Sequence, residues 1–552
     1  MYSKVSAIAN NLLLMLYTFL CMFFLSNFGY SQEKTTFSIG PSINSKIVTN
    51  KFSDIRIRSV KTYLNKDYSQ ISNHFSTNYP FIKRIQIAGA IGGSVGRDLF
   101  INPLNRNDLN DYNFTTLIEA CKRAKRQNLI PVLNLTAVPL KLSKNPFIGS
   151  FGVNVRQPKN YDTWNNYIQA IIYSLVKEFG KDELRNWSWE FGLEYENKNW
   201  FNAGTPDSTK EAFFKIYDYG VAALEKVFGD DHFLVGVHCM AGSPGYWDEL
   251  TFFDHITKEQ NYSTGKIGTK IDFVSISFYN TFPSTFDTPR LLEVTKLIKS
   301  KILDCGCGLN DIKFGINEGQ ILYGWDKKQL RGHVVQHPIQ GPAEAKFFKA
   351  MVDQDIDYCS IWEDNFNEPV SLCVNTVQLL SRMVNENLLE TAINTSSNKG
   401  ENNEFDGLAT YNKSTKILHF YVYNNNNDQN SIKGIKSLIK IKGIELTKDK
   451  ALLTKWTIDE DHSNWWKQWT LDSKEIPDSL YADSKYAGGS ILIKKEYLTL
   501  WKGKVKEYQK TASLVPESVE FEIKDNEIDI NVDLQHHSFM FFELKGVTFL
   551  NK

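Results

Sequence analysis

The chain has 552 residues, with 63 basic and 63 acidic side chains and a formal net charge of zero. This length predicts several domains, or one large barrel with a companion domain, and the 42% apolar content excludes a mainly disordered chain. The balanced charge argues against nucleic-acid binding, which needs a basic excess. Aromatic residues make up 13% of the chain. They can fill cores, or they can form flat apolar surfaces on which sugar rings stack.

The first 31 residues have the pattern of a secretory signal peptide. Lys4 gives a basic start, an apolar run (LLLMLYTFLCMFFL) covers residues 12–25, and small and polar residues follow up to Ser31. We expect cleavage after Ser31. The alternative is an uncleaved anchor, but the apolar run is shorter than the roughly 20 residues that span a bilayer. We therefore expect an exported mature chain, periplasmic or secreted, with no membrane span.

The cysteines and histidines predict neither a disulfide scaffold nor a metal site. Beyond Cys21, six of the seven cysteines remain, which is too few for a disulfide-based fold of this length. Cys305 and Cys307 form the only close pair, and no second Cys or His pair lies at zinc-like spacing. His333 and His337 have an i, i+4 spacing but flank a probable loop. We expect no metal and no cofactor.

From the N-terminal third onward, short apolar runs alternate with segments of helical periodicity. This pattern predicts a parallel sheet, and eight such units predict a (β/α)8 TIM barrel over residues 32–390. The alternative is an open doubly wound sheet that binds a nucleotide, but the glycines at 89, 92 and 93 lack the G-x-G-x-x-G spacing. The expected strands are 55–57, 82–87, 130–135, 187–191, 233–237, 273–278, 313–316 and 358–362. The expected helices are 114–127, 164–179, 211–228, 290–303 and 343–353.

After about residue 390 the pattern changes to short alternating runs with no convincing helix. This pattern predicts a β-sandwich accessory domain over residues 391–552. An aromatic-rich segment at 456–469 (WTIDEDHSNWWKQW) interrupts it, and we expect its tryptophans to pack the sandwich onto the barrel. The expected strands are 417–423, 437–442, 490–493, 519–523, 527–532 and 539–544.

Carboxylates stand at the ends of two of the expected barrel strands, where the catalytic residues of such barrels lie. Glu194 follows the fourth strand in the segment WSWEFGLEYEN, and Glu318 follows the seventh in FGINEGQ. Two carboxylates that face each other can cleave a glycosidic bond, one by protonating the leaving oxygen and the other by attacking the anomeric carbon. Burial beside aromatic rings would keep the acid protonated, while nearby donors would keep the nucleophile ionised. Glu196 is a fallback acid, expected beyond the mouth.

Three segments resemble glycoside hydrolase family 39, a family of β-xylosidases and α-L-iduronidases in a clan of retaining (β/α)8 glycosidases. Residues 187–197 resemble its tryptophan-rich fourth strand, which ends in W-N-E-P, and residues 314–320 resemble its strand-seven T-E-W-G-like motif. Residues 458–464 (IDEDHSN) resemble its I-D-x-x-H-S-N segment in the β-sandwich. The resemblance implies that Glu194 is the acid/base, Glu318 the nucleophile and Glu190 an earlier, structural glutamate.

The resemblance also extends to residues around the sugar. Residues 275–279 (SISFY) resemble the family's S-x-H-x-Y, which implies that Tyr279 hydrogen-bonds the nucleophile. Residues 358–364 (YCSIWED) resemble the eighth strand, which implies that Trp362 forms the floor of the sugar subsite. The chain departs from the family where Leu193 and Tyr195 replace the Asn and Pro that flank the acid/base. It also has Ser277 in place of the strand-six His and Gly319 in place of the Trp after the nucleophile.

Other candidate residues keep two interpretations. His238 either lines the pocket or is a hydrogen-bonded core histidine. Trp325 and Trp247 each either contact the sugar or pack against the barrel rim. Arg97 and Asp98 either hold a charged or hydroxyl-rich substrate or are solvated loop charges.

The sequence therefore predicts an exported, retaining glycosidase that takes an oligosaccharide or polysaccharide substrate. An exo-acting β-xylosidase-like enzyme that trims plant or algal oligosaccharides fits the resemblance best. The alternative is a catalytically impaired carbohydrate-binding protein on a glycosidase scaffold, suggested by the altered neighbours of both glutamates.

Overall fold

A computed structural model describes residues 35–240, 245–282, 288–304, 312–323, 337–394, 403–426, 434–447, 450–472, 474, 495–521, 523 and 525–550. The predicted signal peptide, Trp325, His333, the cysteine pair at 305 and 307, and the expected strand at 490–493 lie outside the described residues. No helix in the described part combines the length and the apolar character needed to cross a membrane.

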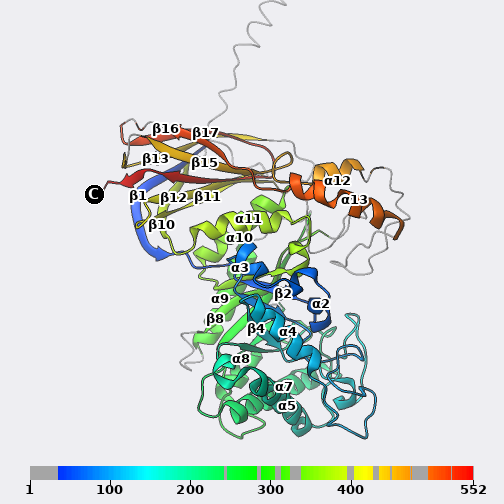
Figure 1. The fold of residues 1–552 in the computed structure, drawn as a ribbon. Helices are drawn as coiled ribbons and strands as arrows, with labels where there is room; N and C mark the ends of the chain where they lie inside the picture. The colour runs from blue at the N-terminus through cyan, green and yellow to red at the C-terminus, as the bar shows by residue number, and fades with distance from the viewer. Residues whose placement is uncertain are drawn as a thin grey trace, which may run out of the picture.

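Eight parallel strands close into a barrel, which forms the lower part of the molecule in Figure 1. The predicted (β/α)8 architecture is confirmed, and the open doubly wound sheet is excluded because β9 pairs with β2 to complete the ring. The short strands β2, β5 and β9 are buried along their whole length, as expected for a parallel sheet covered on both faces. The barrel strands are β2 (Asp54–Ile57), β3 (Arg84–Ile87), β4 (Ile130–Asn134), β5 (Ser188–Phe191), β6 (Leu234–Cys239), β7 (Phe273–Phe282), β8 (Lys313–Tyr323) and β9 (Tyr358–Trp362).

Helices follow most of these strands and cover the outside of the barrel. Helix α7 shows how the local sequence sets the ends: Thr205 caps its first turn, Pro206 occupies the first helical position, and Gly229 ends it with a positive φ. The helices of this region are α2 (Val60–Leu64), α3 (His74–Asn78), α4 (Thr115–Arg126), α5 (Tyr161–Phe179), α6 (Lys181–Leu184), α7 (Pro206–Phe228), α8 (Thr251–Lys258), α9 (Thr288–Asp304), α10 (Gln340–Asp353) and α11 (Leu372–Leu380).

The second unit is a nine-stranded sheet, mostly antiparallel, at the top of Figure 1. Its order is β16-β15-β18-β12-β11-β10-β1-β13-β17, and a short pair, β14-β19, accompanies it. Its strands are β1 (Thr35–Ile47), β10 (Asn387–Asn394), β11 (Asn403–Asn412), β12 (Ile417–Asn426), β13 (Ile435–Lys442), β15 (Ala451–Ile458), β16 (Glu517–Phe521), β17 (Glu527–Leu534) and β18 (Ser538–Lys545). The short pair is β14 (Ile444–Leu446) and β19 (Val547–Phe549).

The expected domain boundaries need correction at the N-terminal side. Residues 32–390 were assigned to the barrel, but β1 is a central strand of the C-terminal sheet, antiparallel to β10 and parallel to β13. Strand β10 also begins before residue 391. From β1 onward the described chain runs from this sheet into the barrel and back into the sheet, so two crossings join the two units.

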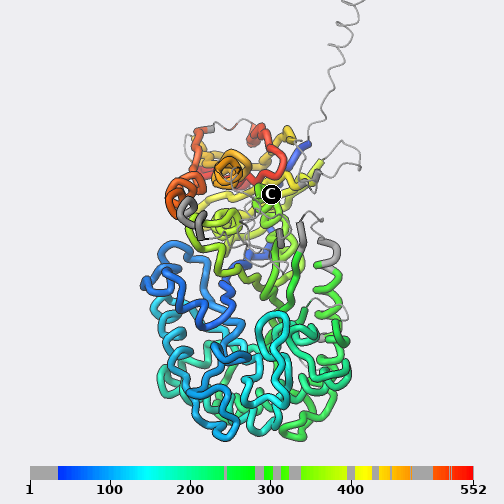
Figure 2. The backbone as a smooth tube through the Cα atoms, turned by 90° about the vertical axis from the view of Figure 1, so that its right-hand side faces the viewer, coloured from blue at the N-terminus to red at the C-terminus, as the bar shows by residue number. Residues whose placement is uncertain are grey.

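The C-terminal sheet has two apolar faces, and alternation along β12 shows both. Phe420 and Val422 enter the core between the sheet layers, whereas Tyr421 and Tyr423 point to the cluster that continues into the barrel. The Tyr421 hydroxyl donates to the carbonyl of Ala345 at 3.0 Å. Helices α10 and α11 lie between the sheet and the barrel (Figures 1 and 2).

The expectation of an accessory domain without helices is wrong. Helices α12 (Trp466–Asp472) and α13 (Lys495–Thr511) lie at the side of the C-terminal sheet. Trp465 and Trp469 of the aromatic-rich segment are buried in the cluster shared with the barrel, and the Trp465 Nε1 donates to the carbonyl of Val370 at 3.2 Å. The segment packs the two units together as expected. It does so through Trp465, just before α12, and Trp469 within α12.

Candidate active site

A pocket of about 300 Å³ opens at the carboxyl ends of the barrel strands. Both predicted carboxylates, Glu194 and Glu318, line it, and so do Tyr279 and Trp362. The loops after β3, β4 and β5 supply much of the remaining wall. This volume is at the lower end of the range for small-ligand sites.

Glu318 lies within β8, not past its end as the sequence pattern suggested. The pairing with β7 shifts by one residue here: Ile276 pairs with Ile316 and Ser277 with Glu318, which leaves Asn317 as a β-bulge. A bulge re-aims side chains. As a result, the consecutive residues Asn317 and Glu318 both contact polar groups of the barrel interior.

The Glu318 carboxylate is held by donors on both oxygens. Arg56 donates to Oε1 from Nη2 at 3.1 Å and from Nε at 3.3 Å, and the Tyr279 hydroxyl donates to Oε2 at 3.2 Å. Arg56 is 1% exposed and Glu318 is 7% exposed. The carboxylate is therefore oriented by charge-assisted hydrogen bonds in an almost dry site.

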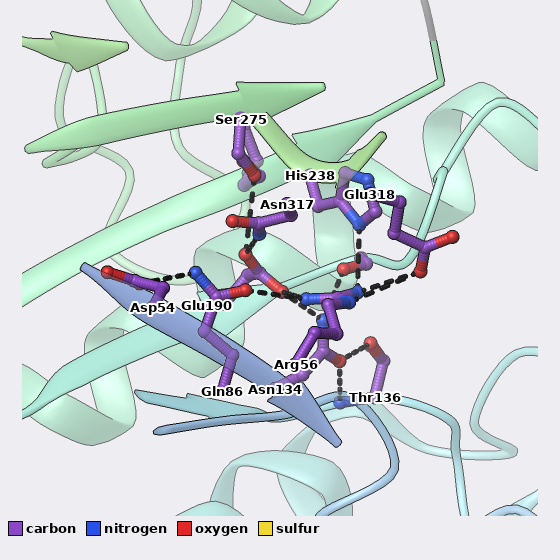
Figure 3. A network of polar contacts seen from close by, with 12 residues as sticks. Asp54, Arg56, Gln86, Asn134, Thr136, Glu190, His238, Ser275, Asn317 and Glu318 are labelled. Atoms are coloured by element: carbon purple, nitrogen blue, oxygen red, sulfur yellow. Dashed lines mark hydrogen bonds and ion pairs between the residues drawn. The ribbon is translucent and has the colours of Figure 1, made fainter. Parts of the chain in front are cut away.

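Arg56 is the centre of the polar network drawn in Figure 3. Besides Glu318, its Nη1 donates to Gln86 at 3.0 Å and lies 3.7 Å from Glu190 Oε1. Burial lowers the pKa of Arg56, but the charges of Glu318 and Glu190 outweigh this and raise it. Glu190 is completely enclosed and also accepts from Asn134 at 2.6 Å, from Asn317 and from Ser275. This agrees with its predicted role as a structural glutamate.

Glu194 occupies a different environment on the opposite side of the pocket. It follows β5 with a left-handed φ of 47°, and its Oε2 accepts from Asn197 Nδ2 at 2.8 Å. Burial, followed by repulsion from the Glu318 charge, raises the pKa of Glu194 to about 7. One carboxylate is thus paired with a cation, while the pKa of the other is raised close to neutral pH.

An aromatic and cationic layer lies next to Glu318. The Trp362 Nε1 donates to the Tyr279 hydroxyl at 2.8 Å, which fixes the ring of each relative to the nucleophile position. Arg58 lies over the Trp362 ring, 5.4 Å from its centre. Tyr279 contacts Glu318 as the resemblance implies, and Trp362 lines the same pocket.

The apolar wall of the pocket includes residues that the sequence analysis did not single out. Phe151 and Trp200 stack with ring centres 4.5 Å apart and an angle of 18° between planes. Phe151 is 38% exposed and lies in a loop, and an exposed aromatic side chain at a barrel mouth is a stacking surface. Arg56 was also missed, although a single arginine inside an otherwise apolar strand (DIRI) was a usable signal.

His238 does not line the pocket, so its assignment to substrate binding is corrected. It is fully buried; its Nδ1 lies 3.2 Å from Arg56 Nη2 and its Nε2 lies 2.9 Å from Ser277 Oγ. Burial and the Arg56 charge hold the pKa of His238 well below its usual value, so it is a neutral member of the network beneath the pocket.

Three other candidates also lie outside the pocket lining. Glu196 is fully buried, does not line the pocket, and accepts from the backbone N–H of Met240 at 2.5 Å. Trp247 packs against Tyr195 and Phe213, which confirms rim packing as its role. Asp98 is not a solvated charge: it is buried and accepts from the backbone N–H groups of Gly93, Ser94 and Leu140.

Within the part of the chain that the structure describes, no cluster of His, Cys, Asp or Glu is arranged to hold a metal ion.

Comparisons with known proteins agree with this arrangement. Residues 59–296 match the family model described as "Glycosyl hydrolases family 39". The chain is 27% identical over 171 residues to a β-xylosidase of Geobacillus stearothermophilus, an alignment that covers 31% of each chain. It is 30% identical over 152 residues to a β-xylosidase of Caldicellulosiruptor saccharolyticus, covering 27% of this chain and 28% of the relative. The alignments thus span less than a third of these relatives' lengths.

The fold match is more extensive than the sequence match. The solved structure of a monomeric β-xylosidase from Caulobacter crescentus superimposes with a TM-score of 0.64. The match covers 92% of this chain and 99% of that one at 12% identity. At this identity the match establishes the fold, a TIM barrel with a β-sandwich.

Proposed function

The chain belongs to glycoside hydrolase family 39, and from this premise we propose that it is a retaining glycosidase with Glu318 as nucleophile and Glu194 as acid/base. One observation carries the proposal: the same pocket holds one carboxylate paired with Arg56 and a second whose pKa is raised to about 7. Two carboxyl groups with opposed protonation are what glycosidic cleavage requires.

In the first step, a Glu318 oxygen attacks the anomeric carbon and the bond from that carbon to the leaving oxygen breaks. Glu194 transfers its proton to the leaving oxygen, so the aglycone departs as a neutral alcohol. Arg56 and Tyr279 hold the Glu318 carboxylate in place before the attack, which limits the reorganisation that the step requires.

In the second step, Glu194 is ionised because it has given up its proton. It accepts a proton from a water molecule, whose oxygen attacks the anomeric carbon and releases Glu318. Two inversions at the same carbon give net retention. Once Glu318 is esterified its charge no longer repels the Glu194 carboxylate, which favours ionised Glu194 as the base in this half of the cycle.

For the substrate we propose an oligosaccharide from a plant or algal polysaccharide, cleaved from its end in the manner of a β-xylosidase. The limited pocket volume supports the removal of single sugars, and the Phe151–Trp200 pair supplies a stacking surface at its wall. The exported location predicted from the sequence suits a substrate met outside the cytoplasm.

A second candidate function is carbohydrate binding without catalysis. The observation that favours it is Leu193, an apolar side chain that lines the pocket where the family motif has an asparagine. An amide at this position would contact the sugar, and its loss removes a polar interaction from the site.

The test is hydrolysis of a panel of aryl glycosides and plant and algal oligosaccharides by the unmodified chain and by Glu318→Gln and Glu194→Gln. Both variants should lose hydrolysis. Glu196→Gln is the matched control, because Glu196 is two residues from the proposed acid but outside the pocket, and it should hydrolyse normally. Full activity in either of the first two variants would refute the assignment. Sugar binding without turnover by the unmodified chain would favour the second candidate.

The acid/base role has a separate test. Glu194 has a positive φ, so glycine fits its backbone conformation without strain. Glu194→Gly should therefore fold well, and azide should partly restore its cleavage of an activated aryl glycoside by replacing water in the second step, which gives a glycosyl azide of retained configuration.

A further inference from the structure

Arg97 is a cation in the pocket that has no partner among the described residues. It lies in the loop after β3, is half-buried, and lines the same pocket as both glutamates. Its backbone N–H donates to the carbonyl of Ser94 at 2.9 Å, but no hydrogen bond or ion pair joins its guanidinium to any described side chain or backbone group. Its neighbour Asp98 does not pair with it, because both Asp98 oxygens accept from backbone N–H groups of the surrounding loops.

The other charges of the pocket are balanced. Arg58 forms ion pairs with Glu363 and Asp364, each at 2.8 Å, and Lys66 supplies the second cation of this cluster by pairing with Asp364 at 2.8 Å. Arg56 balances Glu318 at 3.1 Å. The pKa of Glu194 is raised to about 7, so this carboxyl group is only partly ionised at neutral pH. Arg97 is therefore the cation of the described pocket wall that no carboxylate pairs with.

The Arg97 side chain lies against one wall of the pocket, close to the backbone. A Cβ atom at Gly89 would lie 3.5 Å from Arg97 Nη1 and 2.9 Å from the carbonyl oxygen of Arg58. The guanidinium thus lies close to Gly89, beside the backbone of Arg58 at the β2–β3 side of the pocket. Burying a cation without a counter-ion is unfavourable, and an anionic ligand would remove that penalty.

We propose that Arg97 binds a carboxylate or a sulfate ester carried by the sugar in the pocket, so that the substrate is an anionic glycoside. The proposal rests on the proposed function in calling this sugar a substrate. The binding of an anionic sugar by Arg97 does not itself require turnover. A guanidinium is planar and presents two parallel N–H groups, which match the oxygens of a carboxylate or sulfate. Arg97 is then a specificity-determining residue, and the proposed chemistry of Glu194 and Glu318 is unchanged.

Isothermal titration calorimetry with three free sugars tests this. D-Glucuronate has the ring of D-xylose with an added carboxylate, and D-glucose 6-sulfate has a sulfate ester on the same side of the ring. At least one of the two anionic sugars should bind to the full chain about tenfold or more tightly than D-xylose, as expected for a charge-assisted bond. Arg97→Met should abolish this preference and leave the Kd for D-xylose within about twofold. The preferred anionic sugar shows whether the site takes a carboxylate or a sulfate ester.

Arg126→Met is the matched control, because Arg126 lies on α4 and pairs with Glu119 away from the pocket. It should keep the preference. The proposal is overturned if neither anionic sugar binds more tightly than D-xylose, if none of the three binds, or if the preference persists in Arg97→Met. Preference without any hydrolysis would refute the proposed function alone, and hydrolysis of neutral aryl glycosides without the preference would refute this inference alone.

Discussion

The guanidinium of Arg56 and the carboxylate of Glu318 form a buried ion pair whose members are 262 residues apart in the chain. Two donor atoms of Arg56 contact one oxygen of Glu318, and the other oxygen accepts from Tyr279. Both charged groups are almost completely shielded from solvent. The pair joins the first barrel strand to the seventh and fixes the proposed nucleophile at the same time.

Arg56→Lys should fold but lose most activity. The ammonium group of a lysine cannot contact Glu318, Gln86 and Glu190 at the same time, as the Arg56 guanidinium does. We expect kcat/KM to fall by about tenfold or more, measured on the best aryl glycoside. Arg56→Leu leaves two buried carboxylates unpaired, and we expect it to lower the free energy of unfolding by roughly 3–5 kcal/mol, measured by urea denaturation. A fully active Arg56→Lys would contradict the role of the pair.

Asn197→Ala should move the alkaline limb of the pH–rate profile to higher pH. Glu194 must be protonated to act as the acid, so kcat/KM should fall as the pH rises through about 7. The Asn197 amide donates to the ionised form of Glu194 and lowers its pKa, so removing the amide should raise that pKa and the limb by about one pH unit. Asn199→Ala, on the exposed side of the same loop, should leave the limb in place.

Tyr279→Phe should reduce turnover and leave the fold intact. The variant removes one donor to Glu318 and the acceptor of the Trp362 indole, while the ring remains. Because a hydrogen bond to a charged group is lost, we expect kcat/KM to fall by about ten- to a hundredfold. Steady-state kinetics and circular dichroism would measure the two effects. Tyr173→Phe, on an exposed face of α5, is the control, and an equal loss in both variants would contradict the prediction.

His419→Gln should destabilise the C-terminal sheet more at pH 6 than at pH 9.5. The imidazole Nδ1 lies 2.9 Å from Glu386 and its Nε2 lies 3.1 Å from Glu543. Burial lowers the pKa of His419, but the two carboxylates outweigh it and raise it. A raised pKa in the folded state gives stability that is fully present below the unfolded value of about 6.5 and is lost as the pH rises through the folded value.

We expect His419→Gln to lower the free energy of unfolding by about 3 kcal/mol at pH 6 and by less at pH 9.5, measured by urea denaturation at both values. The exposed His232→Gln is the control and should change stability little at either pH. An effect of equal size at both pH values would show that His419 is not charged in the folded protein.

Local patterns predicted most of the barrel because its strands and helices are short, regular and bounded by clear signals. The expected helix at 114–127 is α4, and the expected strand at 358–362 is β9. The accessory domain was harder to predict from local patterns. Helices α12 and α13 lie in a region dominated by short alternating runs, and β1 joins its sheet through partners about 340 to 400 residues away.

The sequence by itself determined the barrel, the two carboxylates at its mouth, and the places of Tyr279 and Trp362, because these depend on periodicity and on short motifs. Only the tertiary structure decided which neighbours each carboxylate has. The bulge at Asn317 turns Glu318 toward Arg56, and burial together with repulsion from Glu318 raises the pKa of Glu194. The burial of His238 and the free charge of Arg97 were decided in the same way. Electrostatics and desolvation depend on distances between residues far apart in the chain, and chain order does not contain these distances until the barrel closes.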